Sequence, residues 1–593
     1  MKKNLFFGML MAATVAFVGC SKEDSPNETP AQKADTQSYL SVQVVPAHQT
    51  RTQSGGYVDG TGAENTVNSV DFYFFKADGS AFLLGTGVVD TSGDAGEVNA
   101  GTYQSNRYTV TNPGVTEKTG ENIDEIVDAV LVIEHNVGNI PASMVAVLNS
   151  TAKYDGKSIA ELKAITDLTT HTSNGFVMTN SVYVGADGAV AMETPITTDN
   201  IKLTANDAKN NPVEIYVERV AVRVAVKNNI TAADNGSYDV DEEITMQNGD
   251  KIKAYAKILA WDINTTADNS HLIKNIDPAW DFAWTWNMPA DYRSYWAKSL
   301  YGTTDETTNV TGGITKNFTW NGIPNSLDAV DYCLENTIEP KFMTATTADG
   351  TVYYDRVQSR VNNTKVLVKA QLVDAQGNDL KIANWYGQNY LESDLKAVIA
   401  NALKTKLLAV TTDADAATTT YTPIQADDIA LRQGTGLNGE DSYKVYFEFS
   451  DAGAAKTWAF INDANAYENY EDVAAAEAAL YDTEPAKVWN GMSYYFVNIE
   501  HLGATKATAD GIANVTEGAA PTAGEYVKGY YGVVRNHAYE VEFTGITGLG
   551  TPVYNGGETI PWPVEPDETE SFISAKINVL SWHLINQSVT LGE

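Results

Sequence analysis

The sequence is poor in cysteine and in basic charge, and both scarcities exclude classes of protein. Its 593 residues include only two cysteines, which excludes a disulfide-rich scaffold and a four-cysteine zinc site. Asp and Glu number 76 against 40 Lys and Arg, giving a formal net charge of −36. Nucleic-acid-binding proteins need basic stripes, so we expect no nucleic-acid partner.

Long apolar runs and catalytic motifs are also scarce. The long apolar run lies within the first twenty residues, so we expect no membrane-spanning helix in the mature chain. The sequence has no His-Glu-x-x-His, no Walker loop and no Gly-x-Ser-x-Gly. The glycines at 434–439 match the dinucleotide-binding pattern, but a strand-like segment follows them instead of the helix that a phosphate site needs. The acidic stretch 374–379 fits a polar turn better than a calcium loop. We predict no enzyme activity, no catalytic residue, no metal and no cofactor.

The N-terminus has the features of an export signal. Two lysines and an apolar run over residues 5–18 are typical of a secretory signal peptide. The run ends at Gly19-Cys20 before a flexible polar stretch, so we predict a bacterial lipobox with Cys20 as the lipidated (palmitoylated) residue. The alternative is a plain signal peptide with a coincidental cysteine. Because lipidation uses Cys20, Cys333 is expected to be a small buried apolar residue.

Short strand-like runs dominate the remaining sequence. Aromatic or β-branched runs of strand length occur at 71–75, 129–133, 145–148, 365–369 and 444–449. The clearest alternation, with a period of two, covers 213–226. Helical spacing is confined to 158–168, 391–408 (with Ser393 as a cap) and 470–480. We predict a mainly β fold with a few short helices and two β-sandwich domains, divided in the Asn- and Gly-rich stretch 228–250.

A strand-like segment at residues 39–45 precedes a protease-sensitive loop. Three of its apolar side chains share one face: Leu40, Val42 and Val44. The polar, glycine-rich loop that follows contains Arg51, the first arginine in the chain. Such a loop is a ready site for a trypsin-like protease, which would cut between Arg51 and Thr52. The alternative is an ordinary exposed arginine.

The tail after a proline-rich spacer also alternates like a strand. Its candidate apolar residues are Phe572, Ile573, Ile577, Val579, Leu580, Trp582, Leu584, Ile585, Val589 and Leu591. The tail is either a last strand folded back on its own domain or a donor strand that completes a neighbouring subunit's sheet. Burying the large groups contributes roughly 13–27 kcal/mol, while ordering the backbone costs on the order of 20 kcal/mol. Side-chain burial alone would therefore nearly cancel the entropic cost. The net stabilisation must come from main-chain hydrogen bonds along both edges of the strand and from a slot already shaped by removal of the first strand.

Several stretches match one known family in order along nearly the whole chain. They are FVMTNS (176–181), VERVA (217–221), LIKNI (272–276), RSYWAKS (293–299), YCLENT (332–337), YYF (494–496), IEHLG (499–503), YGVVRNHAY (531–539), GLGTPV (548–553) and the tail. The chain resembles the type V pilins, or fimbrillins, of the Mfa-type fimbria major subunit family. The resemblance implies two transthyretin-like β-sandwich domains and a lipoprotein precursor carried to the outer membrane.

The resemblance also implies a function. An arginine-specific or trypsin-like protease would cut after Arg51, remove the strand that contains Leu40, Val42 and Val44, and allow polymerisation by C-terminal donor-strand exchange. The product would be the stalk of a cell-surface fimbria that supports adhesion and biofilm formation, with anchor and tip subunits as further partners.

This interpretation divides the chain into five segments. They are a signal peptide (1–20), a propeptide (21–51), an N-terminal β-sandwich (52–228), a C-terminal β-sandwich (229–566) and a donor tail (567–593). The alternative function is a surface glycan-binding lipoprotein of β-sandwich architecture, suggested by eleven Trp and 31 Tyr. Four of these tryptophans cluster: Trp280, Trp284, Trp286 and Trp296.

Overall fold

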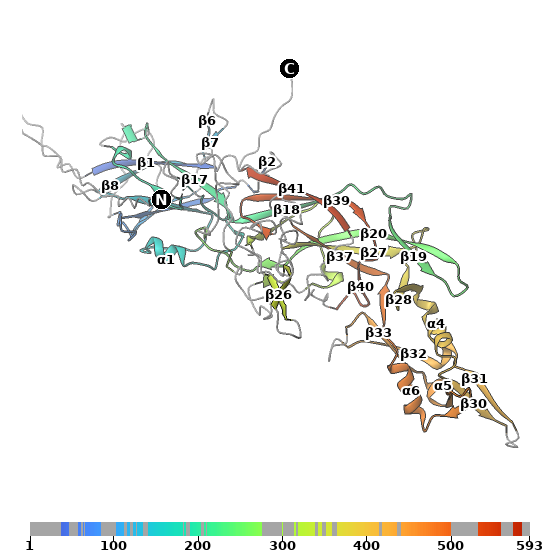
Figure 1. The fold of residues 1–593 in the computed structure, drawn as a ribbon. Coiled ribbons are helices and arrows are strands. Elements are labelled where there is room, and N and C mark those ends of the chain that lie inside the picture. Colours follow the sequence, from blue (N-terminus) through green and yellow to red (C-terminus); the bar gives the residue numbers. More distant parts are fainter. Residues whose placement is uncertain are drawn as a thin grey trace, which may run out of the picture.

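A computed structural model describes most of the chain. The described residues are 37–46, 57–60, 63–64, 66–84, 102–111, 116–118, 123–125, 127–134, 140–181, 183–184, 190–202, 207–208, 210–275, 299–300, 314–315, 318–337, 342–346, 352–357, 364–413, 418–435, 441–499, 532–558 and 573–583. Strands dominate, and helices are few and short, which confirms the predicted mainly β class. In Figure 1 the molecule is elongated, with the N-terminal strands at one end and an orange lobe at the other.

The N-terminal unit is one curved sheet. Its ten strands run in the order β16-β1-β17-β12-β9-β3-β5-β4, with β15 also on β9 and β8 also on β1. They are β1 (Gln37–Pro46), β3 (Ser69–Phe75), β4 (Thr102–Gln104), β5 (Arg107–Thr111), β8 (Val127–Glu134), β9 (Ser143–Leu148), β12 (Met178–Asn180), β15 (Thr194–Pro195), β16 (Ile201–Lys202) and β17 (Val213–Arg219). Leu40 of β1 and Val110 of β5 share one core cluster, so the sheet curves around that core.

Both faces of this sheet are covered, which explains why β3 is buried at every position. Phe72 and Phe74 enter the inner core, whereas Tyr73 and Phe75 alternate to the outer face. Helix α1 (Ile159–Lys163) packs its Leu162 on that outer face. A capping box fixes the start of α1, because Ser158 and Glu161 exchange side-chain and backbone hydrogen bonds.

The alternating segment 213–226 forms two strands rather than the single strand that we predicted. β17 ends at Arg219 in the N-terminal sheet, and β18 (Ala221–Asn228) begins in a different sheet. The change of sheet lies at Val220, ahead of the predicted division at 228. The apolar alternation shifts by one residue at this junction, from odd positions up to Val217 to even positions from Val220. Val217, Val220 and Val222 are each buried, but in three different clusters.

The C-terminal unit is a β-sandwich. One sheet has the order β2-β41-β39-β18-β23, and the other has the order β32-β33-β36-β28-β29-β19-β20-β27-β37-β40. The strands of the first are β2 (Tyr57–Asp59), β18, β23 (Val330–Leu334), β39 (His537–Ile546) and β41 (Ile573–His583). Those of the second are β19 (Tyr238–Thr245), β20 (Lys251–Asn264), β27 (Lys365–Val373), β28 (Lys381–Trp385), β29 (Gln388–Leu391), β32 (Ile429–Gln433), β33 (Lys444–Phe449), β36 (Ala486–Asn490), β37 (Met492–Asn498) and β40 (Thr551–Val553). Val224 and Val541 of the first sheet pack with Val368 of the second in one core.

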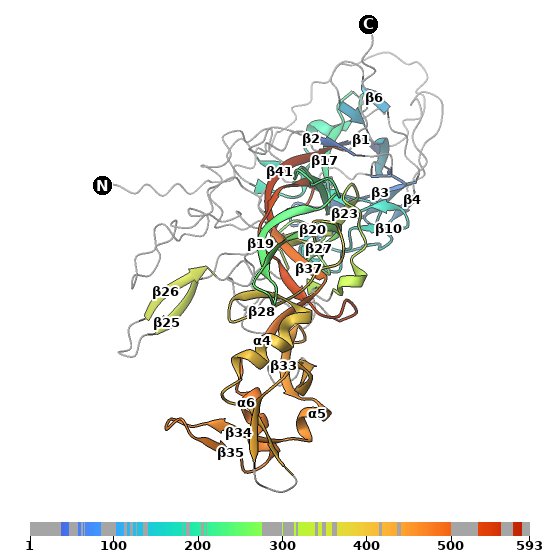
Figure 2. The same ribbon diagram turned by 90° about the vertical axis from the view of Figure 1, so that its right-hand side faces the viewer.

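A lobe extends from the second sheet, and Figure 2 shows it hanging below the sandwich. It contains a four-stranded sheet, β31-β30-β34-β35, and three helices around one core. These elements are β30 (Leu408–Thr412), β31 (Thr419–Pro423), β34 (Thr457–Ile461), β35 (Tyr467–Asn469), α4 (Leu395–Ala402), α5 (Asp451–Ala454) and α6 (Val473–Tyr481). The predicted cap Ser393 is wrong: it lies inside the 3-10 turn η5 (Glu392–Asp394), and Asp394 occupies the cap position of α4.

Short pairs and turns complete the described fold. The pairs are β6 (Thr116–Lys118) with β7 (Ile123–Glu125), β10 (His171–Thr172) with β11 (Gly175–Phe176), β13 (Tyr183–Val184) with β14 (Val190–Ala191), β21 (Thr266–Ala267) with β22 (Ile314–Thr315), β24 (Asn336–Thr337) with β38 (Gly532–Val533), and β25 (Phe342–Thr346) with β26 (Val352–Val357). The other 3-10 turns are η1 (Thr198–Asn200), η3 (Trp320–Gly322) and η6 (Ala426–Asp428).

Candidate strand-exchange site

The first strand is paired along both of its edges. β1 runs antiparallel to β8, with Leu40 opposite Leu131, and parallel to β17, with Val42 opposite Val213. Val44 lies opposite Ile215 in the same parallel ladder. Removing β1 would therefore leave β8 and β17 with unpaired backbone groups that face each other.

The same strand contributes to the N-terminal core. Leu40 and Val42 are both 0% exposed and pack in one cluster with Ile215 and Phe72. Burial of two such side chains stabilises the fold by about 3–6 kcal/mol. Loss of β1 would thus remove apolar filling as well as ladder bonds, and would leave a slot with the shape of a strand.

The C-terminal strand of this subunit is folded back on its own domain, which is the first of the two alternatives for the tail, and not extended away from it. β41 runs antiparallel to β39, from Ile573 opposite Ile546 to Ser581 opposite His537. The physical reason is that β39 offers a long free edge on which the returning tail can complete a ladder. Of the predicted donor residues, this strand contains Ile573, Ile577, Val579, Leu580 and Trp582.

Other predicted site residues lie outside the described part of the chain. They are Cys20, Arg51, Thr52, Phe572, Leu584, Ile585, Val589 and Leu591. The four clustered tryptophans, which suit a core or a subunit contact as well as a glycan platform, also lie outside it. Cys333 is buried and free, as the sequence predicts.

A buried ionic cluster that was not predicted from the sequence lies where the two units meet. The Nζ atom of Lys274 lies 3.1 Å from Oε1 of Glu218, and both side chains are 0% exposed. Arg535 pairs with Glu335, and these two side chains are also 0% exposed. The Arg535 Nη2 group further donates to Oγ of Ser270 at 3.0 Å and to the carbonyl oxygen of His271 at 2.8 Å. We call these four charged residues, Glu218, Lys274, Glu335 and Arg535, the joint cluster.

Burial governs the electrostatics of the joint cluster. It raises the pKa of Glu218 and lowers that of Lys274, and in each case the partner's charge opposes the shift. Burial would also raise the pKa of Glu335, but the guanidinium of Arg535 outweighs it and holds that pKa below its usual value. Each residue comes from a different family-like stretch of sequence, so these stretches converge at one place. A charged residue within an apolar run, as in LIKNI, is the signal that could have found it.

Glu64 anchors the segment that follows β2. The Nε and Nη2 groups of Arg219 both donate to its carbonyl oxygen at 3.2 Å. Its carboxylate pairs with Nε of Arg223 at 3.2 Å and accepts from Oη of Tyr332 at 2.5 Å. Glu64 is 1% exposed. The chain is therefore fixed at residue 64 by groups from β17, β18 and β23.

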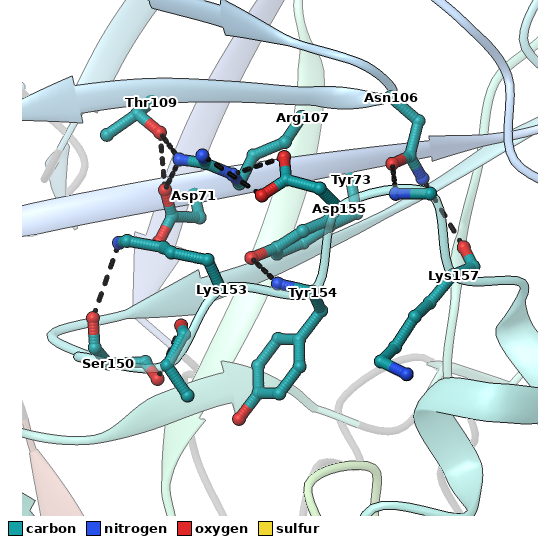
Figure 3. Close-up of polar contacts among 12 residues, drawn as sticks. Asp71, Tyr73, Asn106, Arg107, Thr109, Ser150, Lys153, Tyr154, Asp155 and Lys157 are labelled. Atoms are coloured by element: carbon teal, nitrogen blue, oxygen red, sulfur yellow. Dashed lines mark hydrogen bonds and ion pairs between the residues drawn. The ribbon is translucent and has the colours of Figure 1, made fainter.

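A second ionic group fixes a loop to the outer face of the N-terminal sheet (Figure 3). Asp71 on β3 accepts from Nη1 of Arg107 at 3.1 Å and from Nζ of Lys153 at 2.5 Å. Arg107 also contacts Asp155, with Nε 2.9 Å from Oδ1. Burial and the nearby Asp71 raise the pKa of Tyr73, whose Oη accepts from the backbone N–H of Tyr154 at 3.2 Å. These contacts are structural: they hold residues 150–157 over β3.

Neither a metal site nor a membrane span is found in the described residues. No group of three or more His, Cys, Asp or Glu side chains among them is placed to hold a metal ion. None of the helices in this part of the chain has both the length and the apolar character to cross a bilayer. The stretch 374–379 is a polar turn, in which Oδ1 of Asp374 accepts from the N–H groups of Gln376 and Asn378, both at 2.9 Å.

Comparisons with known proteins identify the C-terminal region. Residues 488–588 match the family described as "Major fimbrial subunit protein type IV, Fimbrillin, C-terminal". The matched region contains β37, β39 and β41, together with Arg535. None of the curated proteins matches the chain.

Solved structures align with much of the chain at low identity. A fimbrilin (FimA) from Porphyromonas gingivalis is 14% identical, covers 92% of this chain and 99% of its own, and has a TM-score of 0.36. A putative cell adhesion protein from Parabacteroides distasonis is 11% identical, covers 93% and 98%, and has a TM-score of 0.33. The tip fimbrial protein Mfa3 from Porphyromonas gingivalis is 9% identical, covers 92% and 100%, and has a TM-score of 0.29. All three overlaps are loose, so the comparison that bears on the family is the C-terminal match. Through that match, residues 488–588 are similar to the C-terminal region of the fimbrillins, a family of fimbrial subunits.

Proposed function

We propose that this protein is the stalk subunit of a type V fimbria. It is exported as a lipoprotein precursor, lipidated at Cys20, held at the outer membrane and cleaved after Arg51. Cleavage releases β1, and the C-terminal strand of another copy fills the vacated slot. Repeated exchange builds a cell-surface polymer that supports adhesion and biofilm formation, together with anchor and tip subunits.

The observation that carries the proposal is the position of β1. It lies upstream of Arg51, yet Leu40 and Val42 are fully buried and both strand edges are paired. A propeptide that only covered the surface could leave without opening the core. Because β1 is parallel to β17 and antiparallel to β8, an inserted strand meets one parallel and one antiparallel neighbour in either direction.

The proposed donor has the strand character that the exchange requires. β41 forms a continuous strand over Ile573–His583 without a helix or proline. A strand with a free end can leave one ladder and join another, whereas a strand held between two loops cannot. The presence of both a cleavable first strand and a terminal donor supports the stalk position, because an anchor would lack the cleavage loop and a tip subunit would lack the donor.

Processing at Arg51 is the step to test. The full precursor and its Arg51→Ala and Arg51→Lys variants are incubated with trypsin-like and with arginine-specific proteases. Polymer is scored by electron microscopy and by ladders on denaturing gels. Wild type should polymerise with either protease, Arg51→Lys with the trypsin-like protease alone, and Arg51→Ala with neither. Polymer from uncut Arg51→Ala would contradict the proposal.

A further inference from the structure

We propose that β2 is a latch that couples cleavage at Arg51 to release of the donor strand β41. This inference rests on the proposed function and adds a step to it: the cut that frees β1 also frees β41. One protease event would then open the acceptor slot and free the donor of the same molecule.

β2 covers the outer edge of the donor strand. Its three residues pair in parallel with the end of β41, with Val58 opposite Trp582 and Asp59 opposite His583. In the described sheet the order is β2-β41-β39, so the end of β41, Ser581–His583, is paired on both edges while β2 is in place. Figure 1 shows β2 and the red β41 side by side at the meeting of the two units.

The precursor tethers β2 at both ends. Upstream, β1 ends at Pro46 and is fixed in the N-terminal sheet by β8 and β17. Downstream, Glu64 is held by Arg219 and Tyr332. Arg51 lies between β1 and β2 in the sequence. Its cleavage therefore removes the upstream tether and leaves the Glu64 anchor intact.

A strand this short depends on its tethers. Three residues provide only a few ladder bonds, and each ordered residue loses backbone entropy. Tethering at both ends confines the strand close to its partner and lowers that entropic cost. After the cut, β2 belongs to a free N-terminus, where chains fray most readily.

Fraying of β2 leaves the end of β41 without a neighbour on its outer edge. The outer backbone groups of Ser581–His583 lose their partners, so this end of the strand becomes a sheet edge. An edge strand peels from one side only, and its exposed groups can begin pairing with a second subunit. The latch thus keeps the donor inactive in the precursor.

Hydrogen exchange of the precursor before and after cleavage tests the latch. Samples are kept dilute, and peptides covering 573–583 are compared with peptides covering 537–546. Amides near Ser581–His583 should exchange at least tenfold faster after the cut, while β39, still paired with β18, should change less than twofold. Val58→Pro in uncut precursor should reproduce the acceleration because proline removes a ladder donor, and Val58→Thr should not. Unchanged exchange of β41 after cleavage, or in Val58→Pro, would overturn the latch.

A reversible cross-link separates this inference from the proposed function. Tyr57→Cys with Ser581→Cys places a disulfide across the β2–β41 register, and Lys227→Cys with Glu542→Cys places one across β18 and β39 in the same sheet. After cleavage, the first variant should polymerise only when reduced, and the second should polymerise in both states. Equal polymerisation of the first variant, oxidised and reduced, would overturn the latch. Failure of cleaved wild type to polymerise would instead overturn the proposed function.

Discussion

Val42 and Val213 lie opposite each other in the parallel ladder between β1 and β17, and both are buried in the N-terminal core. One member of this pair lies upstream of Arg51, and the other belongs to the sheet that remains after cleavage. Under the proposed cleavage, the precursor is completed by a strand that the mature subunit would lose. The proposal therefore makes the stability of the precursor and its ability to polymerise depend on the same residues.

Substitution of Leu40 should destabilise the precursor but not the fibre. Leu40→Ala leaves a cavity in a closed core and should lower the free energy of unfolding of the precursor by about 2–5 kcal/mol. Fibres assembled after cleavage no longer contain residue 40, so they should melt like wild type. Glu214→Gln, on the exposed face of β17, is the matched control and should change neither. Denaturant titration of the precursor and thermal melting of the fibre measure the two effects.

The joint cluster should behave as a coupled buried pair. Lys274→Met should cost about 3–5 kcal/mol, because Glu218 would remain as an uncompensated buried charge. Adding Glu218→Gln should recover most of that loss, and denaturant unfolding of the single and double variants gives the coupling energy. The exposed pair Lys251–Glu243, at 2.8 Å, provides the control, and Lys251→Met should cost less than about 1 kcal/mol. Additive losses from Lys274→Met and Glu218→Gln would show that the two charges act independently.

His537 should make the domain with the donor strand sensitive to acid. Burial lowers its pKa from 6.5 to about 4, so between these values the unfolded chain binds the proton more tightly than the folded chain. Stability should therefore fall as the pH drops through this window, by about 3 kcal/mol at its lower end.

A matched variant isolates the contribution of His537. Asp262, whose pKa burial raises to about 7, titrates in the same window with the opposite sign. The quantity to measure is hence the difference between wild type and His537→Gln in unfolding free energy at pH 7.5 and pH 4.5. A pH dependence that is the same in both proteins would rule out His537 as the source.

The sequence predicts strands well where they are buried on a regular pattern. The run 71–75 lies in β3, and the runs 365–369 and 444–449 lie in β27 and β33. Periodicity shows the change of sheet within 213–226 only as a one-residue shift of the apolar alternation between Val217 and Val220, which a single run with a period of two conceals. Periodicity could not place β41, since the same alternation suits a strand in its own sheet or in a neighbour's.

The partners within the joint cluster could not be predicted from local sequence, although a charged residue in an apolar run marks one of its members. Glu218 and Arg535 are far apart in the chain, and only the meeting of the two units brings them together. The Ser393 prediction failed for a local reason: a 3-10 turn precedes α4 and moves the cap position to Asp394. The pattern of apolar residues thus predicts neither which distant charges pair nor at which residue a helix begins.

Binding of a synthetic donor strand is the most direct measurement of the central claim. A peptide of residues 572–591 is titrated against uncut precursor and against cleaved subunit from which β1 has been removed, with a scrambled peptide as the control. The account predicts that the donor peptide binds the cleaved subunit, blocks its polymerisation and does not bind the precursor. Equal binding to both forms, or polymerisation unaffected by a saturating amount of peptide, would contradict it.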